Sequence, residues 1–174
     1  MTACTACIGE ASSGAPGPSK GGPEPQPLPY EVEVTSASSG LRSALQAGEF
    51  HFALDAGRAL GGEQSAASPV QGFIGSIVAC TQITLQIVAK DAGVELPAIS
   101  WRGFGVFDAQ RLVSGSETDP RFQRITVHGK VEGAAVGQAE LDALAARTSA
   151  RCPISQSLHP SIVYELKLEK QRSE

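Results

Sequence analysis

The segment PVQGFIGSIVACTQITLQIVAK, residues 69–90, decides the fold that we predict for this chain. Ser68 lies directly before it and is a good helix N-cap, and Pro69 suits the first helical position. Gln71 lies three residues after Ser68 and completes a capping-box pattern. The segment is therefore predicted to form one long helix, with Cys80 near its middle.

The apolar side chains of this helix surround most of its circumference, which is typical of a buried helix. Lys90 suits the negative end of the helix dipole, and Gly93 suits the stop. Because four polar side chains interrupt the segment, we expect that it does not cross a membrane. These polar residues are Gln71, Ser76, Gln82 and Gln86.

Alternating apolar and polar residues on both sides of the helix predict strands. The predicted strands cover residues 30–35, 41–46, 50–54, 99–106, 122–131 and 162–168, and the further helices cover residues 137–148 and 153–158. Because strands and helices do not alternate as repeated βαβ units, the α+β class fits best. One sheet cannot cover so apolar a helix in a domain of this size, which favours a homodimer that sandwiches the helices.

The composition indicates an ordinary globular domain. The chain has 174 residues, of which 41% are hydrophobic and 18% are charged. The net charge of −4 and the absence of a Lys/Arg cluster argue against binding to nucleic acid. Four cysteines in a chain of this length indicate free or redox-active thiols in a reducing compartment. Because the N-terminus also lacks the pattern of a secretory signal, we expect a cytoplasmic protein.

Residues 1–29 differ in composition from the rest of the chain. Six of the eleven prolines lie there, together with many Gly and Ser residues. Such a segment cannot bury enough apolar surface to offset its ordering entropy, so we predict a disordered tail before a folded domain of residues 30–174. Cys4 and Cys7 form a CxxC pattern in this tail without the partner pair of a zinc site, and we interpret them as two incidental exposed cysteines.

The sequence around the other two cysteines, Cys80 and Cys152, gives more reason to consider reactive thiols. Because Pro153 starts a short helix, Cys152 is its N-cap, where unpaired backbone N–H groups favour a thiolate. The alternative is an incidental capping residue. Cys80 on an apolar helix resembles an inert core residue unless a cation lies beside it. Arg42 and Arg151 are the candidate cations, and sequence spacing alone neither places them nor shows that the two thiols meet.

Several motifs, in this order, resemble the OsmC/Ohr family of osmotically inducible and organic-hydroperoxide-resistance proteins. The helix start Ser68-Pro69, the position of Cys80 after that proline, and the helix end AKDAG (residues 89–93) carry the first part of the resemblance. PRFQRI (residues 120–125) resembles the middle segment of the family, and CPIS (residues 152–155) resembles its second-cysteine motif. The resemblance covers nearly the whole predicted domain.

This resemblance implies an α+β homodimer with two long central helices, intertwined antiparallel sheets and active sites at the subunit interface. It implies that Cys80 is the peroxidatic cysteine, which attacks an organic hydroperoxide and becomes a sulfenic acid. Cys152 is then the resolving cysteine, and a dithiol such as a lipoylated protein reduces the resulting disulfide. The implied function is a thiol-dependent peroxidase without a cofactor or metal ion, and without nucleic-acid or membrane partners.

Two positions depart from the pattern of this family. Peroxidatic members carry an acidic residue directly after the helix-start proline, which positions an arginine over the thiolate, whereas this chain has Val70. The activating arginine normally follows two glycines in a turn, and the segment from Ser39 to Arg42 matches only in part. Arg42 is the candidate activator, or otherwise an exposed strand arginine, and Glu63 is a candidate substitute for the acid. The alternative function is a non-enzymatic or weakly active OsmC-like dimer that binds a hydrophobic small molecule or responds to redox state.

The three histidines add little to either function. His51 and His128 are expected on the polar faces of strands, and His159 follows the Cys152 helix. A zinc site made from the two cysteines and a histidine has no support in the spacing.

Overall fold

A computed structural model describes residues 27–133 and 135–171 of the chain. The predicted tail, with Cys4 and Cys7, lies outside the described residues up to residue 26. One compact unit spans residues 33–174. Residues 27–34 are exposed and have no regular secondary structure, so the strand predicted for residues 30–35 is wrong, because the apolar side chains there have nothing to pack against.

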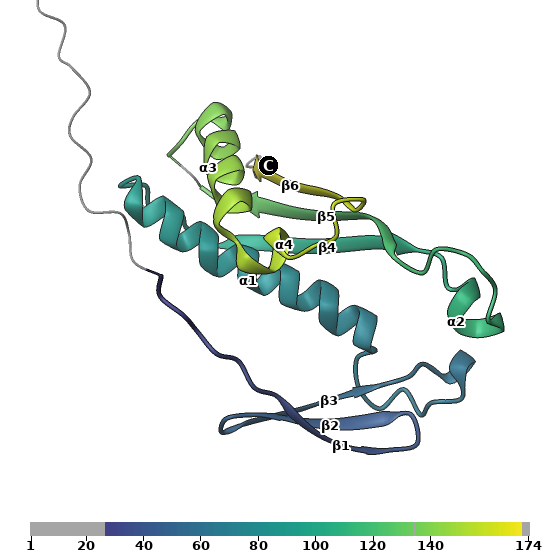
Figure 1. The fold of residues 1–174 in the computed structure, drawn as a ribbon. Coiled ribbons are helices and arrows are strands. Elements are labelled where there is room, and N and C mark those ends of the chain that lie inside the picture. Colours follow the sequence, from purple (N-terminus) through teal and green to yellow (C-terminus); the bar gives the residue numbers. More distant parts are fainter. Residues whose placement is uncertain (1–26, 134, 172–174) are drawn as a thin grey trace, which may run out of the picture. The chain divides into compact units, whose positions relative to one another are not determined.

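Strands and helices of this unit follow one another in mixed order, as the α+β prediction requires (Figure 1). The strands are β1 (Thr35–Ser39), β2 (Arg42–Ala47), β3 (Phe50–Asp55), β4 (Ile99–Phe107), β5 (Phe122–Val131) and β6 (Val163–Lys170). The helices are α1 (Pro69–Asp91), α2 (Gln110–Ser114), α3 (Gln138–Arg151) and α4 (Pro153–Gln156), with a short 3₁₀ helix η1 at Arg58–Leu60.

Both ends of α1 form as the sequence predicts. The Gln71 N–H donates to Ser68 Oγ at 3.3 Å, and the Ser68 N–H donates back to Gln71 Oε1 at 2.8 Å, which completes the capping box. Gly93 follows the helix with φ +69°, and the next residue, Val94, donates its N–H to the Ala89 carbonyl at 2.9 Å. The glycine therefore ends the helix in the left-handed conformation that other residues disfavour.

Two three-stranded sheets lie before and after α1 in the sequence. β1, β2 and β3 form an antiparallel sheet, as expected. In the second sheet β4 and β5 are antiparallel, but β5 and β6 run parallel, which corrects the prediction of purely antiparallel sheets. The parallel pair is possible because α3 and α4 form a crossover long enough to return the chain to the same end of the sheet.

Glycines let α1 pack closely on the second sheet. An added Cβ at Gly103 of β4 would lie 2.6 Å from Val78 Cγ2 and 2.7 Å from Ile74 Cγ2. Gly105 approaches Ile74 almost as closely. A register shift occurs just after these glycines, between Val106 and Phe107. β4 therefore carries glycine where the helix crosses it, because a side chain there would push the two layers apart.

The buried side of α1 contributes to two apolar clusters. The first joins Leu85, Val88 and Ala89 of α1 to Leu141, Leu144 and Ala145 of α3. The second joins Ile77 of α1 to Ile125 and Val127 of β5. Cys80 lies between these clusters in the sequence of α1, and the fold therefore holds it over the sheet.

The opposite side of α1 is exposed in the single chain, so the single chain buries only one side of this helix. Phe73, Ile83 and Ile87 are 38%, 62% and 47% exposed. By length and composition alone α1 could cross a membrane, since its mean hydropathy reaches 1.6 over an 18-residue window. Its other face packs against the second sheet and α3, as in a core helix. One chain alone does not cover the exposed face.

Candidate functional site: a pair of thiols between two helices

Cys80 and Cys152 come together in this fold. Cys80 lies on α1, Cys152 lies directly before α4, and each thiol is among the groups that shift the pKa of the other. Both are free thiols. Cys152 is fully buried, whereas Cys80 is half-buried. A molecule that arrives from solvent therefore reaches Cys80 first.

Cys152 has the surroundings of the more acidic thiol. It is the N-cap of α4, with Pro153 at the first helical position, as its sequence indicates. Burial raises the pKa of the Cys152 thiol, but hydrogen bonds from the backbone and side chain of Ser155 and from Cys80 outweigh burial and lower it overall. The start of α4 therefore stabilises negative charge on Cys152.

Cys80 is the less acidic thiol of the pair. Burial raises the pKa of the Cys80 thiol, and the hydrogen bond with Cys152 and the charge of Cys152 raise it further. Hydrogen bonds from the Ile154 backbone and the Thr84 side chain lower the pKa of Cys80, but it stays above its ordinary value. In the reduced pair the first proton to leave therefore comes from Cys152, and Cys80 keeps its own.

Hydroxyl groups that the sequence analysis missed surround the two thiols. Tyr164 of β6 places its hydroxyl 3.2 Å from Thr81 Oγ1. The Thr84 side chain lowers the pKa of the Cys80 thiol, and the Ser155 side chain lowers that of the Cys152 thiol. The available signal was spacing, because Thr81 and Thr84 lie within about one turn after Cys80. Tyr164 gave no such signal, since its position in an alternating strand is that of an ordinary core residue.

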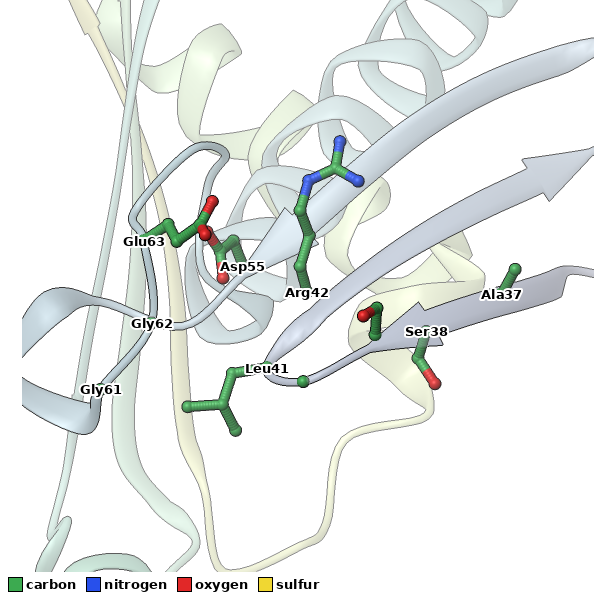
Figure 2. A pocket seen from close by; sticks show the side chains of 10 residues that line it. Ala37, Ser38, Leu41, Arg42, Asp55, Gly61, Gly62 and Glu63 are labelled. Carbon is green, nitrogen blue, oxygen red and sulfur yellow. The ribbon is translucent and has the colours of Figure 1, made fainter.

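Arg42 lies on β2 and is not among the groups that affect the pKa of either thiol most strongly. Instead it lines a cavity of about 530 Å³ together with Asp55, Glu63 and the turn after β1 (Figure 2). The second candidate cation, Arg151, forms an ion pair with Asp91 at the surface.

Asp55 is a buried carboxylate that the sequence analysis also missed. It is 2% exposed, is the cross-strand partner of Arg42, and accepts hydrogen bonds on Oδ2 from the Ser65 N–H at 2.8 Å and the Ser65 hydroxyl at 2.9 Å. The backbone hydrogen bond from Ser65 does most to lower the pKa of Asp55, burial opposes it, and the charge of Arg42 lowers it slightly. Asp55 is therefore an ionised carboxylate beside Arg42, whereas Glu63 is exposed.

Val70 lines a different, mostly apolar groove of about 560 Å³ along α1. Its other apolar lining residues include Ile74, Val78, Ala79, Phe104 and Phe122. Ala79, which also lines this groove, is the residue directly before Cys80. The position at which relatives carry an acid is therefore part of an apolar surface in this chain.

The histidines lie apart from the thiols. His159 Nδ1 is 2.8 Å from Ser161 Oγ, and Arg121 contacts the same ring. His128 Nε2 is 3.0 Å from Glu169, and His51 is exposed. Within residues 27–133 and 135–171, no group of three His, Cys, Asp or Glu side chains could hold a metal ion.

An α+β fold in which a thiol on a long core helix meets a second thiol at a helix start defines a class of cysteine-pair proteins. The family model of the OsmC-like proteins matches residues 62–167, which is more than half of the chain. The chain therefore belongs to the OsmC-like protein family, and the resemblance found in the sequence is confirmed. No curated protein sequence matches the chain significantly.

Solved structures share the fold at low sequence identity. An OsmC-like protein from Mycoplasma pneumoniae is 12% identical, with a TM-score of 0.71 over 83% of this chain and 100% of the other. The organic hydroperoxide resistance protein OsmC from Legionella pneumophila is 22% identical, with a TM-score of 0.61 over 80% and 97%. The organic hydroperoxide resistance protein OhrB of Bacillus subtilis is 21% identical, with a TM-score of 0.56 over 80% and 98%. These similarities establish the OsmC-like fold.

Proposed function

We propose that this chain is a thiol-dependent peroxidase that reduces organic hydroperoxides with Cys80 and Cys152 as its redox pair. The observation that carries this proposal is that the fold brings the two thiols close enough to shift each other's pKa, with Cys80 half-buried and Cys152 fully buried. The names of the Legionella and Bacillus proteins, which describe organic hydroperoxide resistance, agree with it.

The proposed reaction has three steps. The Cys80 thiolate attacks the outer peroxide oxygen, so that an S–O bond forms, the O–O bond breaks and the organic part leaves as an alcohol after taking up a proton. Cys152 then attacks the sulfenic acid of Cys80, which forms the disulfide and releases water. A dithiol reductant, for example a lipoylated protein, restores both thiols by exchange and is itself oxidised.

The apolar groove along α1 supports an organic substrate over hydrogen peroxide. Val70, Ile74 and Phe122 line it, as does Ala79, which directly precedes the attacking cysteine in the sequence. Burial of an alkyl or aryl group there contributes about 25 cal/mol per Å² of apolar area. Hydrogen peroxide has no such group, so this groove adds nothing to its binding.

We propose that the active form is a homodimer in which Arg42 of one chain serves Cys80 of the other. The exposed apolar face of α1 needs a cover, and Arg42 within its own chain lines a separate cavity. A cation at Cys80 would counteract the effects that raise the pKa of this thiol. Asp55, ionised and next to Arg42, takes the restraining role of the acid that is absent at Val70.

The test is peroxide consumption with a dithiol reductant and cumene hydroperoxide, with the wild type compared with Cys80→Ser and Cys152→Ser. We expect Cys80→Ser to abolish turnover, and Cys152→Ser to slow it and let Cys80 become over-oxidised, because no thiol remains to resolve the sulfenic acid. Consumption that is unaffected by Cys80→Ser would exclude the proposed peroxidase.

A second candidate function has one observation in its favour. The pKa of Cys80 is raised in the single chain, which disfavours the attacking thiolate. The alternative is a redox-responsive OsmC-like dimer that forms the Cys80–Cys152 disulfide but turns over little peroxide. The same assay separates the two, because this alternative gives one disulfide per chain with stoichiometric peroxide and no sustained consumption. Either function suits the reducing cytoplasm.

A further inference from the structure

Tyr164 is a half-buried polar side chain that neither proposed function uses. It lies on β6, where it pairs with Ile125 of β5, and its ring packs in an apolar cluster with Ile154 and Leu158. Its hydroxyl leaves this cluster and lies 3.2 Å from Thr81 Oγ1. A tyrosine in such a cluster normally finds a hydrogen-bond partner for its hydroxyl, and here that partner follows Cys80 directly in the sequence.

The second neighbour of this hydroxyl belongs to the other cysteine. The Ser155 side chain lowers the pKa of both the Tyr164 hydroxyl and the Cys152 thiol, so it lies near both groups. Ser155 is 7% exposed, and its hydroxyl also donates to the Cys152 carbonyl at 3.2 Å. Thr81 is fully buried. Tyr164 therefore connects α1, through the hydroxyl contact with Thr81, to α4, through the apolar cluster that also holds Ile154.

The surroundings of the Tyr164 hydroxyl favour its protonated form. Burial raises its pKa above the ordinary tyrosine value, the hydrogen bond with Thr81 lowers it less, and negative charge on Cys152 or Cys80 raises it again. A hydroxyl that keeps its proton remains a donor throughout the pH range in which the thiols react.

A disulfide needs a connection of this kind because its geometry is narrow. The Cβ atoms of the two cysteines must lie about 3.5–4.5 Å apart, whereas Cys80 and Cys152 belong to helices that are far apart in the sequence. α4 has only four residues, and small shifts of so short an element separate the sulfur atoms. Holding both partners in place raises the effective concentration of one thiol at the other.

We propose that Tyr164 is a positioning residue for the Cys80–Cys152 disulfide, because its hydroxyl contacts Thr81 beside one cysteine and its ring packs in the same apolar cluster as Ile154 near the other. This inference rests on the redox pair of the proposed function but not on peroxide turnover. It assigns Tyr164 a role in the formation of the S–S bond. In that reaction the two thiols lose two protons and two electrons to an oxidant such as glutathione disulfide. The oxidant is thereby reduced to two glutathione thiols.

The test is the equilibrium between the Cys80–Cys152 dithiol and its disulfide in glutathione redox buffers, measured by thiol trapping and mass spectrometry. The full chain carries Cys4→Ser and Cys7→Ser, so that two cysteines remain. We expect Tyr164→Phe, which keeps the ring and removes the hydroxyl, to lower the equilibrium constant for the disulfide about 3- to 10-fold, as for one lost hydrogen bond. Tyr30→Phe, the matched change at the other tyrosine, which is 89% exposed, should leave it unchanged.

Thr81→Val provides a second variant that does not depend on the fate of the tyrosine ring. We expect it to lower the same equilibrium constant, and the double variant with Tyr164→Phe to lower it by less than the product of the two single effects. An equilibrium constant within twofold of the wild type for both single variants, or fully independent effects, would overturn the proposal. If the peroxidase proposal fails but the equilibrium shifts, the role of Tyr164 stands, because glutathione replaces the peroxide.

Discussion

At the scale of single residues, each of the two thiols affects the pKa of the other. Groups at the start of α4 lower the pKa of Cys152. Burial raises the pKa of Cys80, and the neighbouring Cys152 raises it further. The cysteine with the better access to solvent is therefore the one that keeps its proton. This distribution explains why a cation is needed at Cys80 before it can attack a peroxide at neutral pH.

The first prediction concerns the pH dependence of Cys80. A raised pKa means that the thiolate, and with it the rate of alkylation, increases only as the pH rises above the ordinary cysteine range. In Cys152→Ala the hydrogen bond and the charge of the neighbour are gone, so the alkylation profile of Cys80 should move to lower pH. Peptide mapping after iodoacetamide labelling would measure this. A profile that stays in place or moves to higher pH would show that Cys152 does not hold the proton on Cys80.

At the scale of elements, the sequence predicts α1 well because the information is local. Ser68, Pro69 and Gln71 determine where the helix begins, and their hydrogen bonds form as expected. The partners of a strand are not local, which is why the parallel pairing of β5 with β6 was missed. The candidate site follows the same division: the cap at Cys152 could be predicted, whereas the approach of Tyr164 could not, since it depends on that parallel register.

The second prediction concerns the contact between α1 and β4. Gly103→Ala should lower the free energy of unfolding by about 1–3 kcal/mol, because the new methyl group would overlap Val78 and Ile74. Urea denaturation at one fixed protein concentration would measure it. Gly57→Ala is the control, since Gly57 has an ordinary φ of −66° and open space around its Cα, and it should change the free energy by less than about 0.5 kcal/mol. Equal effects of the two substitutions would contradict the close packing of helix on sheet.

At the scale of the whole molecule, the exposed apolar residues of the single chain point to a second copy. Ile83 and Ile87 of α1 and Phe50 of β3 are each at least 47% exposed, which is unusual for large apolar side chains in such numbers. Arg42 provides the functional counterpart, because within its own chain the candidate activator lines a cavity whose lining residues include neither Cys80 nor Cys152. A dimer would explain both observations with one contact.

The third prediction follows from that arrangement and uses mixed subunits. We expect the chain to sediment at twice its mass of 18.0 kDa, and Cys80→Ser and Arg42→Ala each to be inactive alone. When the two variants are refolded together, random pairing makes about half of the dimers mixed, and each mixed dimer contains one site with an intact Cys80 and an intact Arg42 from different chains. Peroxide turnover should therefore return to about a quarter of the wild-type value. If native mass spectrometry shows mixed dimers and turnover stays absent, Arg42 does not act across the subunit interface, and the raised pKa of Cys80 must be offset by another group.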